Sequence, residues 1–390
     1  MIAVVGIGAD GWAGLGERAR AAVLGAPEVI GSVRQLELLP AEVAARRRAW
    51  PSPIGPLVEE IVAEPGADRC VLASGDPMLY GIGATLARRL GVQRLEIHPH
   101  PSAFALACAR LGWPAAEVEL VSTVGRPADR LARALAPGRR VIVFGDAGEV
   151  ARVLAERGYG PSRLVVLEQL GGVEERIGDG VSAAPPHSLH AVAIECRAEP
   201  GALVLGRTPG LPDEAFDHDG QLTKRHVRAV TLAALVPLPH QLLWDVGAGS
   251  GSISIEWLRA EPTARAVAVE ARADRAARAR ENARRLGVPE LEVRVGRAPE
   301  ALDGLEDPDA VFLGGSVGEA RLIDHAMGRL RPGGRIVANA VTLEGERALQ
   351  QARGQYGGTL TRIAVEHAEP IGRYTAWRPQ LGVVQWAARR

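Results

Sequence analysis

Short apolar runs alternate with longer Ala- and Arg-rich stretches throughout the first half of the chain. Glycine and proline turns separate the runs from the stretches, and this pattern predicts strands alternating with helices, as in α/β folds. The first expected helix lies around residues 17–24. The expected strands are residues 2–6, 28–31, 70–74, 95–98, 118–122, 140–144, 164–168 and 190–196.

The second half repeats this alternation more regularly. Helices are expected at 224–234 and 273–286, and strands at 242–246, 266–270, 291–295, 310–313 and 335–338. Between the halves, residues 197–212 are rich in Pro and Gly, which indicates a domain boundary. A chain of 390 residues is long enough for two domains. We therefore predict one domain over 1–200 and a second over 205–390.

Charge and composition narrow the function classes. The chain has 46 Lys and Arg against 46 Asp and Glu, so it lacks the basic footprint of a dedicated nucleic-acid binder. No run of 18 uncharged apolar residues occurs, and no basic segment precedes the first apolar run, so we expect neither a membrane span nor a signal peptide. Cys70, Cys108 and Cys196 form no C-x-x-C pair, so we expect no metal site and a reducing, cytoplasmic location.

A glycine-rich turn, Asp245-Val-Gly247-Ala-Gly249-Ser-Gly251, lies between an expected strand and an expected helix. Glycines let the backbone turn tightly and let a ligand approach the helix N-terminus. Glu270 ends the next strand, where a carboxylate can accept the hydroxyl protons of a ribose. A plain turn with an exposed Glu is the alternative, but the combination favours a nucleotide-type cofactor site.

Further residues separate S-adenosylmethionine from a nicotinamide dinucleotide. Asp245 suits a ligand with an ammonium and a sulfonium, whereas it would repel a pyrophosphate. Ala298, after the third strand, is placed to pack against an adenine, and Gly314 ends the fourth strand in a close-approach turn. The set resembles a class I S-adenosylmethionine-dependent methyltransferase. Its expected cofactor residues are Asp245, Gly247, Gly249, Gly251, Glu270, Ala298 and Gly314.

The amino-terminal half carries a second set of glycine turns. Gly6-x-Gly8-x-x-Gly11 fits the dinucleotide fingerprint by letter, but the next strand ends without the acidic residue that an NAD site needs. Together with the turns at 74–77, 80–83 and 99–103 and the segment 168–176, it resembles a tetrapyrrole methylase, another fold that binds S-adenosylmethionine. The resemblance implies cofactor contacts at Gly6, Gly8, Ser74, Gly75, Asp76, Gly81, Gly83, Ser102 and Ala103.

The predicted fold is therefore a two-lobed tetrapyrrole methylase domain followed by a Rossmann-like class I methyltransferase domain. With this domain order, the whole chain resembles one family, the precorrin-6Y C5,15-methyltransferases (decarboxylating) of cobalamin biosynthesis. The string from Gly210 to Arg228 is similar to the entry segment of that family's second half. Two positions depart from the family pattern: His226 stands where it has Glu, and Val124 stands where it usually has His.

The resemblance implies methyl transfer from S-adenosylmethionine to C5 and C15 of a small-molecule precorrin, with decarboxylation of its C12 acetate. The first domain would methylate C5, and the second would methylate C15 and decarboxylate. Transfer from a sulfonium requires alignment more than a strong base. We therefore expect catalytic contributions from Lys224, Thr223 and Asn339, and a homo-oligomer. Candidate anchors for substrate carboxylates are Arg126, Arg207, Arg225, Arg228, Arg373 and Arg378.

Two other functions stay open on sequence alone. An RNA methyltransferase can be built from the same two folds, although the neutral charge and the 4% aromatic content argue against RNA binding. The second alternative is a sensor that binds S-adenosylmethionine without transferring methyl groups. Asn282, on the helix that follows Glu270, is expected to be exposed.

Overall fold

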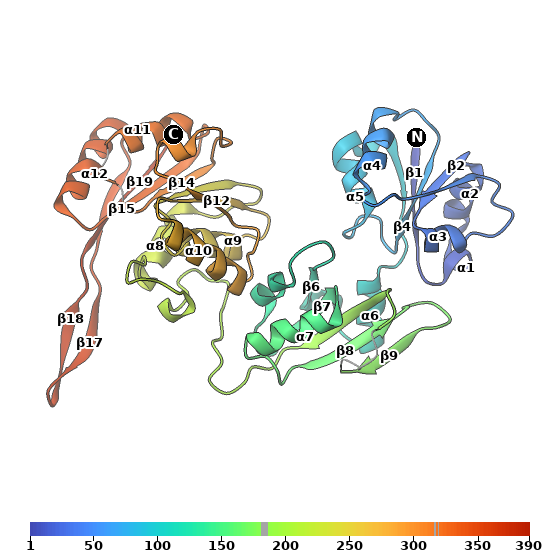
Figure 1. Ribbon diagram of the computed structural model, residues 1–390, viewed down its shortest axis with the longest axis horizontal. Helices are drawn as coiled ribbons and strands as arrows, with labels where there is room; N and C mark the ends of the chain where they lie inside the picture. The colour runs from blue at the N-terminus through green and yellow to red at the C-terminus, as the bar shows by residue number, and fades with distance from the viewer. Residues whose placement is uncertain (181–185, 316, 319) are drawn as a thin grey trace. The chain divides into compact units, whose positions relative to one another are not determined.

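The computed structural model describes residues 1–180, 186–315, 317–318 and 320–390. The chain forms two compact units. The first unit comprises Met1–Ala128 and Pro137–Pro200, and the second comprises Asp129–Ala136 and Gly201–Arg390 (Figure 1). The short helix η3 (Ala128–Ala134) therefore lies almost entirely in the second unit.

The first unit begins with a five-stranded parallel sheet in the order β3-β2-β4-β1-β5. Val4 and Val5 of the interior strand β1 are fully buried in two different apolar clusters, so both faces of the sheet are covered, as is usual for parallel sheets. The strands are β1 (Ile2–Ile7), β2 (Glu28–Gly31), β3 (Arg46–Ala49), β4 (Cys70–Ser74) and β5 (Leu95–His98). The helices are α1 (Gly11–Gly14), α2 (Glu17–Gly25), α3 (Val33–Glu37), α4 (Gly55–Ala63) and α5 (Ile82–Leu90).

A second sheet completes the first unit, in the order β6-β7-β10-β8-β9. β6 and β7 run parallel, and β10 is antiparallel to both β7 and β8. Ala107 and Cys108 of α6 pack against this sheet. The strands are β6 (Val118–Ser122), β7 (Arg140–Phe144), β8 (Arg163–Glu168), β9 (Arg176–Asp179) and β10 (His190–Glu195), and the helices are α6 (Ala103–Leu111) and α7 (Ala147–Glu156).

The second unit contains a seven-stranded sheet in the order β13-β12-β11-β14-β15-β19-β16. Leu243 and Trp244 of the interior strand β11 belong to different apolar clusters, so helices cover both faces. The strands are β11 (Leu242–Val246), β12 (Arg265–Glu270), β13 (Glu292–Val295), β14 (Ala310–Leu313), β15 (Arg335–Ala340), β16 (Thr359–Ile363) and β19 (Val383–Arg389). The helices are α8 (Arg225–Leu235), α9 (Ser252–Ala260), α10 (Ala273–Arg285), α11 (Ala320–Arg329) and α12 (Leu343–Tyr356).

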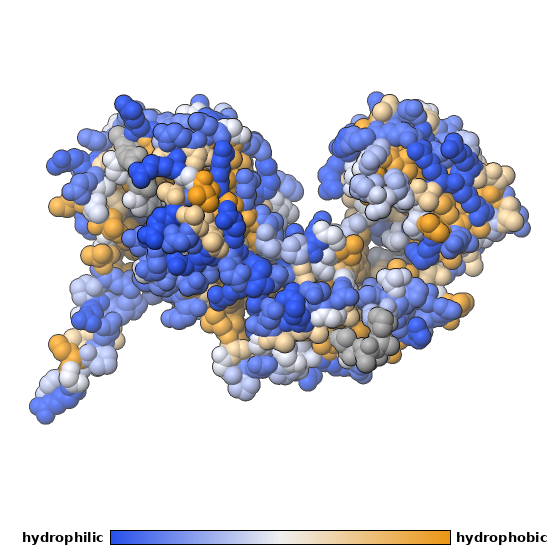
Figure 2. Space-filling model, viewed as in Figure 1, coloured by the Kyte–Doolittle hydropathy of each residue, from blue (hydrophilic) through white to orange (hydrophobic). Residues whose placement is uncertain are grey.

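A two-stranded hairpin projects from the rest of the second unit (Figure 1). It consists of β17 (Glu366–Ile371) and β18 (Tyr374–Pro379), which pair only with each other among the described strands. Ile371, Tyr374 and Trp377 are 62%, 65% and 71% exposed, and apolar and polar residues alternate along its surface (Figure 2). Exposed apolar side chains on a projecting hairpin mark a surface available for contacts.

The expected α/β pattern is confirmed, because every strand predicted from the sequence is present with its ends shifted by at most two residues. The strands β3, β9 (Arg176–Asp179), β16, β17, β18 and β19 were not predicted. For β3 the reason is that its sequence Arg46-Arg-Arg-Ala49 carries no apolar alternation and that it lies at an edge of its sheet. None of the described helices is both long and apolar enough to cross a bilayer.

Candidate functional site

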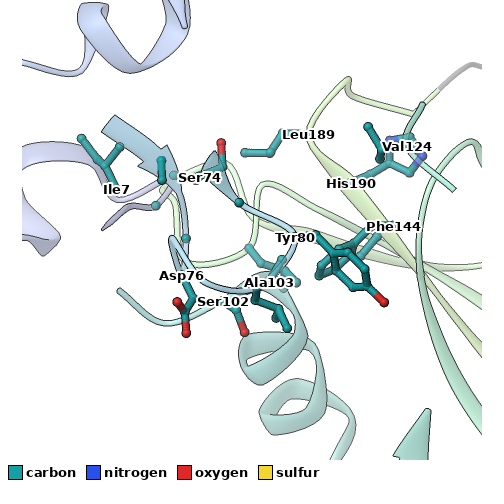
Figure 3. A pocket seen from close by; sticks show the side chains of 18 of the residues that line it. Ile7, Ser74, Asp76, Tyr80, Ser102, Ala103, Val124, Phe144, Leu189 and His190 are labelled. Atoms are coloured by element: carbon teal, nitrogen blue, oxygen red, sulfur yellow. The ribbon is translucent and has the colours of Figure 1, made fainter. Parts of the chain in front are cut away.

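The first unit contains a cavity of about 710 Å³ between its two sheets (Figure 3). Its walls are the carboxyl ends of β1, β4, β6 and β7 and the start of the antiparallel strand β10. Strand ends of an open α/β sheet are the usual place for a ligand crevice. Of the nine residues predicted to bind cofactor in this half, seven line the cavity: Gly8, Ser74, Gly75, Asp76, Gly81, Ser102 and Ala103.

Gly6 and Gly83, the other two, do not line the cavity. A Cβ atom on Gly6 would lie 2.1 Å from the carbonyl oxygen of Gly75, and one on Gly83 would lie 2.8 Å from the carbonyl oxygen of Pro77. These glycines let backbone segments approach each other closely behind the cavity wall. Their contribution is therefore to the shape of the cavity.

Hydrogen bonds hold the polar side chains of the cavity wall in place. The Ser74 hydroxyl accepts from Gln35 Nε2 at 3.1 Å and from Arg34 Nη2 at 3.4 Å. Asp76 Oδ1 accepts from the Met78 amide at 2.8 Å. Gln35, which no motif of the sequence marks, is buried at 3% exposure and also forms a capping box with Ser32. Burial lowers the pKa of Arg34.

Tyr80 and Phe144 give the cavity an aromatic wall (Figure 3). Their rings meet edge to face with centroids 6.4 Å apart, and the Arg126 guanidinium carbon lies 5.6 Å from the Tyr80 ring centre. Tyr80 has a φ of 54°, a left-handed conformation that costs a non-glycine residue about 1 kcal/mol. Aromatic faces beside a guanidinium suit a flat ring that bears carboxylates.

His190 lies at the start of β10 and lines the same cavity. Its Nδ1 lies 2.7 Å from the carbonyl oxygen of His187. Its Nε2 is buried and has no hydrogen-bond partner among the residues that the structure describes. The sequence pattern predicts a strand from His190 to Cys196 but no functional role for this residue.

In the second unit, the glycine-rich turn joins β11 to α9. Gly247, Gly249 and Gly251 have φ values of 76°, 56° and 77°, all in the left-handed region that favours glycine. A Cβ on Gly251 would lie 3.1 Å from Ala279 Cβ, so this glycine lets α9 pack closely on α10. A Cβ on Gly249 would meet only the Gln221 carbonyl oxygen, at 3.7 Å. Open space therefore lies beside the middle of the turn.

Asp245 is next to the last residue of β11, directly before this turn, and is 1% exposed. Its Oδ2 accepts from the Ser254 amide at 3.1 Å and from the Ser254 hydroxyl at 2.7 Å. Its Oδ1 is buried and, within the described chain, accepts no hydrogen bond. Burial, with a smaller contribution from the Glu270 charge, raises the pKa of Asp245 to about 6. A buried carboxylate oxygen without a donor fits the ammonium group of S-adenosylmethionine.

Glu270 is 6% exposed and is held by two backbone amides. Its Oε2 accepts from the Gly249 amide at 2.9 Å, and its Oε1 accepts from the Arg272 amide at 2.9 Å. Each carboxylate oxygen can accept a further hydrogen bond, which leaves capacity for ribose hydroxyls. Ala298 packs half-buried against the core, and Gly314 lies where a Cβ would be 3.0 Å from the Gly247 carbonyl oxygen.

The predicted catalytic residues of the second unit are only partly brought together. Lys224 caps α8, is 43% exposed in its side chain, and has its Nζ 3.9 Å from Asp213 Oδ2. Asn339 Nδ2 donates to Thr231 Oγ1 at 2.9 Å, and its Oδ1 accepts from Gln385 Nε2 at 3.0 Å. Thr231 lies on the same helix as Lys224, but two turns further along, which is about 10 Å.

Arg228 cannot anchor a substrate, contrary to expectation, because its side chain is fully buried. It donates to Glu256 Oε1 and to the carbonyl oxygens of Leu211 and Thr223. It also donates to Asp213 Oδ1 at 3.1 Å. Arg228 therefore holds the segment 211–223 on α8, and the Thr223 carbonyl is one of the groups that it holds.

Asn282 is also buried, at 0% exposure, so the prediction that it is exposed is wrong. Its Oδ1 accepts from the Asp217 amide at 2.9 Å. Its Nδ2 donates to the carbonyl oxygens of Asp217 and Ser250, at 2.9 and 3.0 Å. The side chain thus joins segment 211–223 to the glycine-rich turn through α10, a role that helical periodicity alone cannot show.

Two family models match the chain. Residues 1–184 match the Tetrapyrrole (Corrin/Porphyrin) Methylases, and residues 214–390 match the Precorrin methyltransferase domain. A Sinorhizobium protein named precorrin-6Y C(5,15)-methyltransferase [decarboxylating] is 45% identical over 394 residues, which cover 99% of this chain and 95% of that protein.

Two shorter relatives are each named for a single methylation. A cobalt-precorrin-7 C(5)-methyltransferase of Salmonella typhimurium is 33% identical and covers 53% of this chain and 98% of its own length. A probable cobalt-precorrin-6B C(15)-methyltransferase (decarboxylating) of Pyrobaculum calidifontis is 38% identical and covers 43% of this chain and 89% of its own length.

Proposed function

The chain belongs to the family of precorrin-6Y C(5,15)-methyltransferases (decarboxylating), and from this premise we propose that its two units divide the reactions between them. The protein is an S-adenosylmethionine-dependent methyltransferase of cobalamin biosynthesis that acts on a precorrin. In the proposal, the first unit methylates C5, and the second unit methylates C15 and removes the C12 acetate carboxyl as carbon dioxide. The two single-methylation relatives, each covering about half of this chain, support this division.

In the second unit, the proposed donor site is the glycine-rich turn with Asp245 and Glu270. S-adenosylmethionine supplies an electrophilic methyl group on a positively charged sulfur. Asp245 Oδ1 would take the ammonium, Glu270 would accept the ribose hydroxyls, and the open space at Gly249 would leave room for the ligand. Ala298 and Gly314 would border the adenine and the methionine part.

In the first unit, the proposed donor residues are those that line the cavity, with Asp76 as the charged one. Tyr80 and Phe144 would stack on the flat precorrin, while Arg126 would pair with one of its carboxylates. These side chains align the methine carbon with the methyl group, and alignment is the main requirement of an in-line displacement.

Lys224 is the proposed cation for a substrate carboxylate in the second unit. It is partly exposed at the start of α8, and its neighbour Asp213 restrains its Nζ. Asn339 and the Thr223 carbonyl are bonded within the protein, so we propose that they position α8 and segment 211–223.

Substitutions in each unit test the division of labour. Asp76→Ala should abolish label at C5 and keep label at C15, whereas Gly249→Ile should do the reverse, because its side chain would fill the open space of the turn. The measurement is the position of isotope-labelled methyl groups in the corrinoid product, determined by nuclear magnetic resonance.

Gly304→Ile is the matched control for Gly249→Ile. Gly304 has a φ of 76° and also faces open space, but it lies in the loop between η5 (Glu300–Leu302) and β14. It carries the same backbone strain as the Gly249 variant and should keep both methylations. Loss of both methylations in either the Asp76 or the Gly249 variant, with the fold intact, would refute the division.

We also propose a cytoplasmic homo-oligomer. Cys70, Cys108 and Cys196 are all free and buried, which suits a reducing compartment. Ile371 and Trp377 on the projecting hairpin supply exposed apolar surface for self-association. Sedimentation should give more than one chain per particle, and Trp377→Lys should lower that number; a monomeric wild type would refute the oligomer.

A further inference from the structure

We propose that His190 accepts the proton that the methine carbon C5 loses when the first unit methylates it. This inference rests on the proposed function, because it requires C5 methylation in the cavity of the first unit. No His, Asp or Glu was expected to handle protons there, and the sequence places an aliphatic residue, Val124, in the nearby loop.

The hydrogen bonds of His190 define which nitrogen is free. The carbonyl oxygen of His187, 2.7 Å from Nδ1, can only accept, so the ring proton lies on Nδ1. Nε2 then keeps its lone pair, and it is a buried atom with no hydrogen-bond partner in the described part of the chain. A buried imidazole nitrogen without a donor is costly, and a proton or a donor group from a ligand would relieve that cost.

The position of His190 in the sheet places it at the wall of the cavity. β10 pairs with β7 from Val192 onward, and His190 lies two residues earlier, at the end of β10 that lines the cavity. Val124 follows β6 on the other side of β7, and both side chains lie at the same side of the cavity (Figure 3).

The other ionisable groups of the cavity are less suited to this role. Asp146 caps α7 by accepting from the Glu149 amide at 2.8 Å, and Asp76 accepts from the Met78 amide at 2.8 Å. Glu168, opposite His190 on β8, accepts from the His187 amide, and its Oε2 lies 3.3 Å from Arg176 Nε. Arg34 is a guanidinium, which donates hydrogen bonds and has no lone pair to take a proton.

The proposed step balances as follows. The π electrons at C5 form a bond to the methyl carbon, and the bond from that carbon to sulfur breaks with its electron pair left on sulfur. C5 then carries both a methyl group and its original hydrogen. That hydrogen leaves as a proton to His190 Nε2, and its bonding electrons restore the conjugation of the macrocycle. The resulting imidazolium releases the proton to water after the product leaves.

Replacement of His190 in the full-length protein tests this assignment. His190→Gln should slow C5 methylation about a hundred-fold, the lower range for loss of a general base, and leave C15 methylation unchanged. The variant should also lose the pH dependence that a general base gives to the C5 rate. A C5-deuterated precorrin should show a larger kinetic isotope effect than in wild type, because proton removal becomes slower. A merely structural role would change neither.

Two further variants provide the controls. His98→Gln makes the same change in the same unit outside the cavity lining, and should keep the C5 rate. Val124→His combined with His190→Gln returns an imidazole to the cavity. The C5 rate of this double variant should be at least tenfold higher than that of His190→Gln alone. Calorimetry with S-adenosylhomocysteine would check that the His190→Gln variant is folded and still binds the ligand in the first unit. If the Gln variant does not fold, His190→Asn replaces it in the same measurements.

Two results would overturn the inference, and they can be told apart. If His190→Gln keeps the C5 rate and its pH dependence while Asp76→Ala abolishes C5 methylation, the division of labour holds and His190 is not the proton acceptor. If Asp76→Ala also leaves C5 methylation intact, the first unit does not methylate C5 and both proposals fail.

Discussion

Asp245 shows how a single buried side chain sets the pH range of a binding site. Its carboxyl is enclosed by protein, and the only donors that reach it belong to Ser254, on one of its two oxygens, among the described residues. Burial therefore raises its pKa from 3.8 to about 6. Between these two values the unliganded unit loses stability as the pH rises, because the folded state holds the proton longer than the unfolded state.

Donor binding should show the opposite trend. The ammonium of the donor pairs with the ionised carboxylate, so affinity at the second site should rise roughly tenfold between pH 5 and 7 and level off above that. Calorimetry in the Asp76→Ala background measures this site alone.

Asp245→Asn supplies the comparison for that titration. Its affinity should be about tenfold weaker than wild type at pH 7.5 and should not vary with pH, since the amide does not ionise. An unchanged pH profile in the Asn variant would show that another group controls donor binding.

Residue by residue, the sequence predicted side chains that lie at the ends of strands. Glu270 and Ser74 each end a strand, Asp245 is next to the last residue of its strand, and strand ends are visible in the apolar pattern. Gln35, Tyr80 and His190 could not be predicted, because they meet only when two sheets and several loops come together. The prediction that Asn282 is exposed was wrong for the same reason, because its hydrogen-bond partners Asp217 and Ser250 are distant in sequence.

At the scale of elements, the buried pair of Arg228 on α8 and Glu256 on α9 joins two helices to segment 211–223. Glu256 accepts from Arg228 and from the amides of Gly210 and Leu211. Removing Arg228 would leave a buried carboxylate without its counter-charge. Arg228→Met should therefore lower the unfolding free energy of the second unit by about 3–5 kcal/mol.

Denaturant unfolding followed by circular dichroism measures that loss. Arg225→Met, on the exposed side of the same helix, should change stability by less than about 0.5 kcal/mol. Arg228→Met with Glu256→Gln should recover part of the loss, because the amide carries no charge to compensate. Equal stability of the Arg228 and Arg225 variants would contradict the importance of the pair.

Element boundaries were predictable where a buried strand forms a continuous apolar run, whereas the buried strand β19, which Gln385 interrupts, was not predicted. The parallel strands β1, β4, β11 and β14 are continuous apolar runs, because both their faces are covered. β3 and the hairpin β17–β18 follow no such rule, since their side chains are mostly exposed. Their pairing depends on neighbours that a one-dimensional pattern does not reveal.

At the scale of the whole molecule, the two units predict the number of donors that one chain binds. Calorimetry should find two molecules of S-adenosylhomocysteine per chain, one in the first-unit cavity and one at the glycine-rich turn. Asp76→Ala and Gly249→Ile should each leave one, and the double variant none. A wild-type stoichiometry of one would show that one of the two proposed sites does not bind the donor.

The order of the two domain types was visible in the sequence, because each carries its own set of glycine turns, and the family matches over 1–184 and 214–390 agree with that order. How the substrate meets each site was not visible. Carboxylate anchors depend on which arginines remain accessible after folding, and Arg228 shows that a string rich in Arg does not identify them.

The way Glu270 is held has a consequence for turnover. Two backbone amides fix its carboxylate before any ligand arrives, and Asp245 is equally fixed by Ser254. The ribose and the ammonium that these groups would bind are identical in the spent cofactor, which differs from the donor only by one methyl group and one charge on sulfur. A site built this way retains what it has used, so the enzyme should suffer strong product inhibition, and its rate should depend on how quickly S-adenosylhomocysteine is cleared around it.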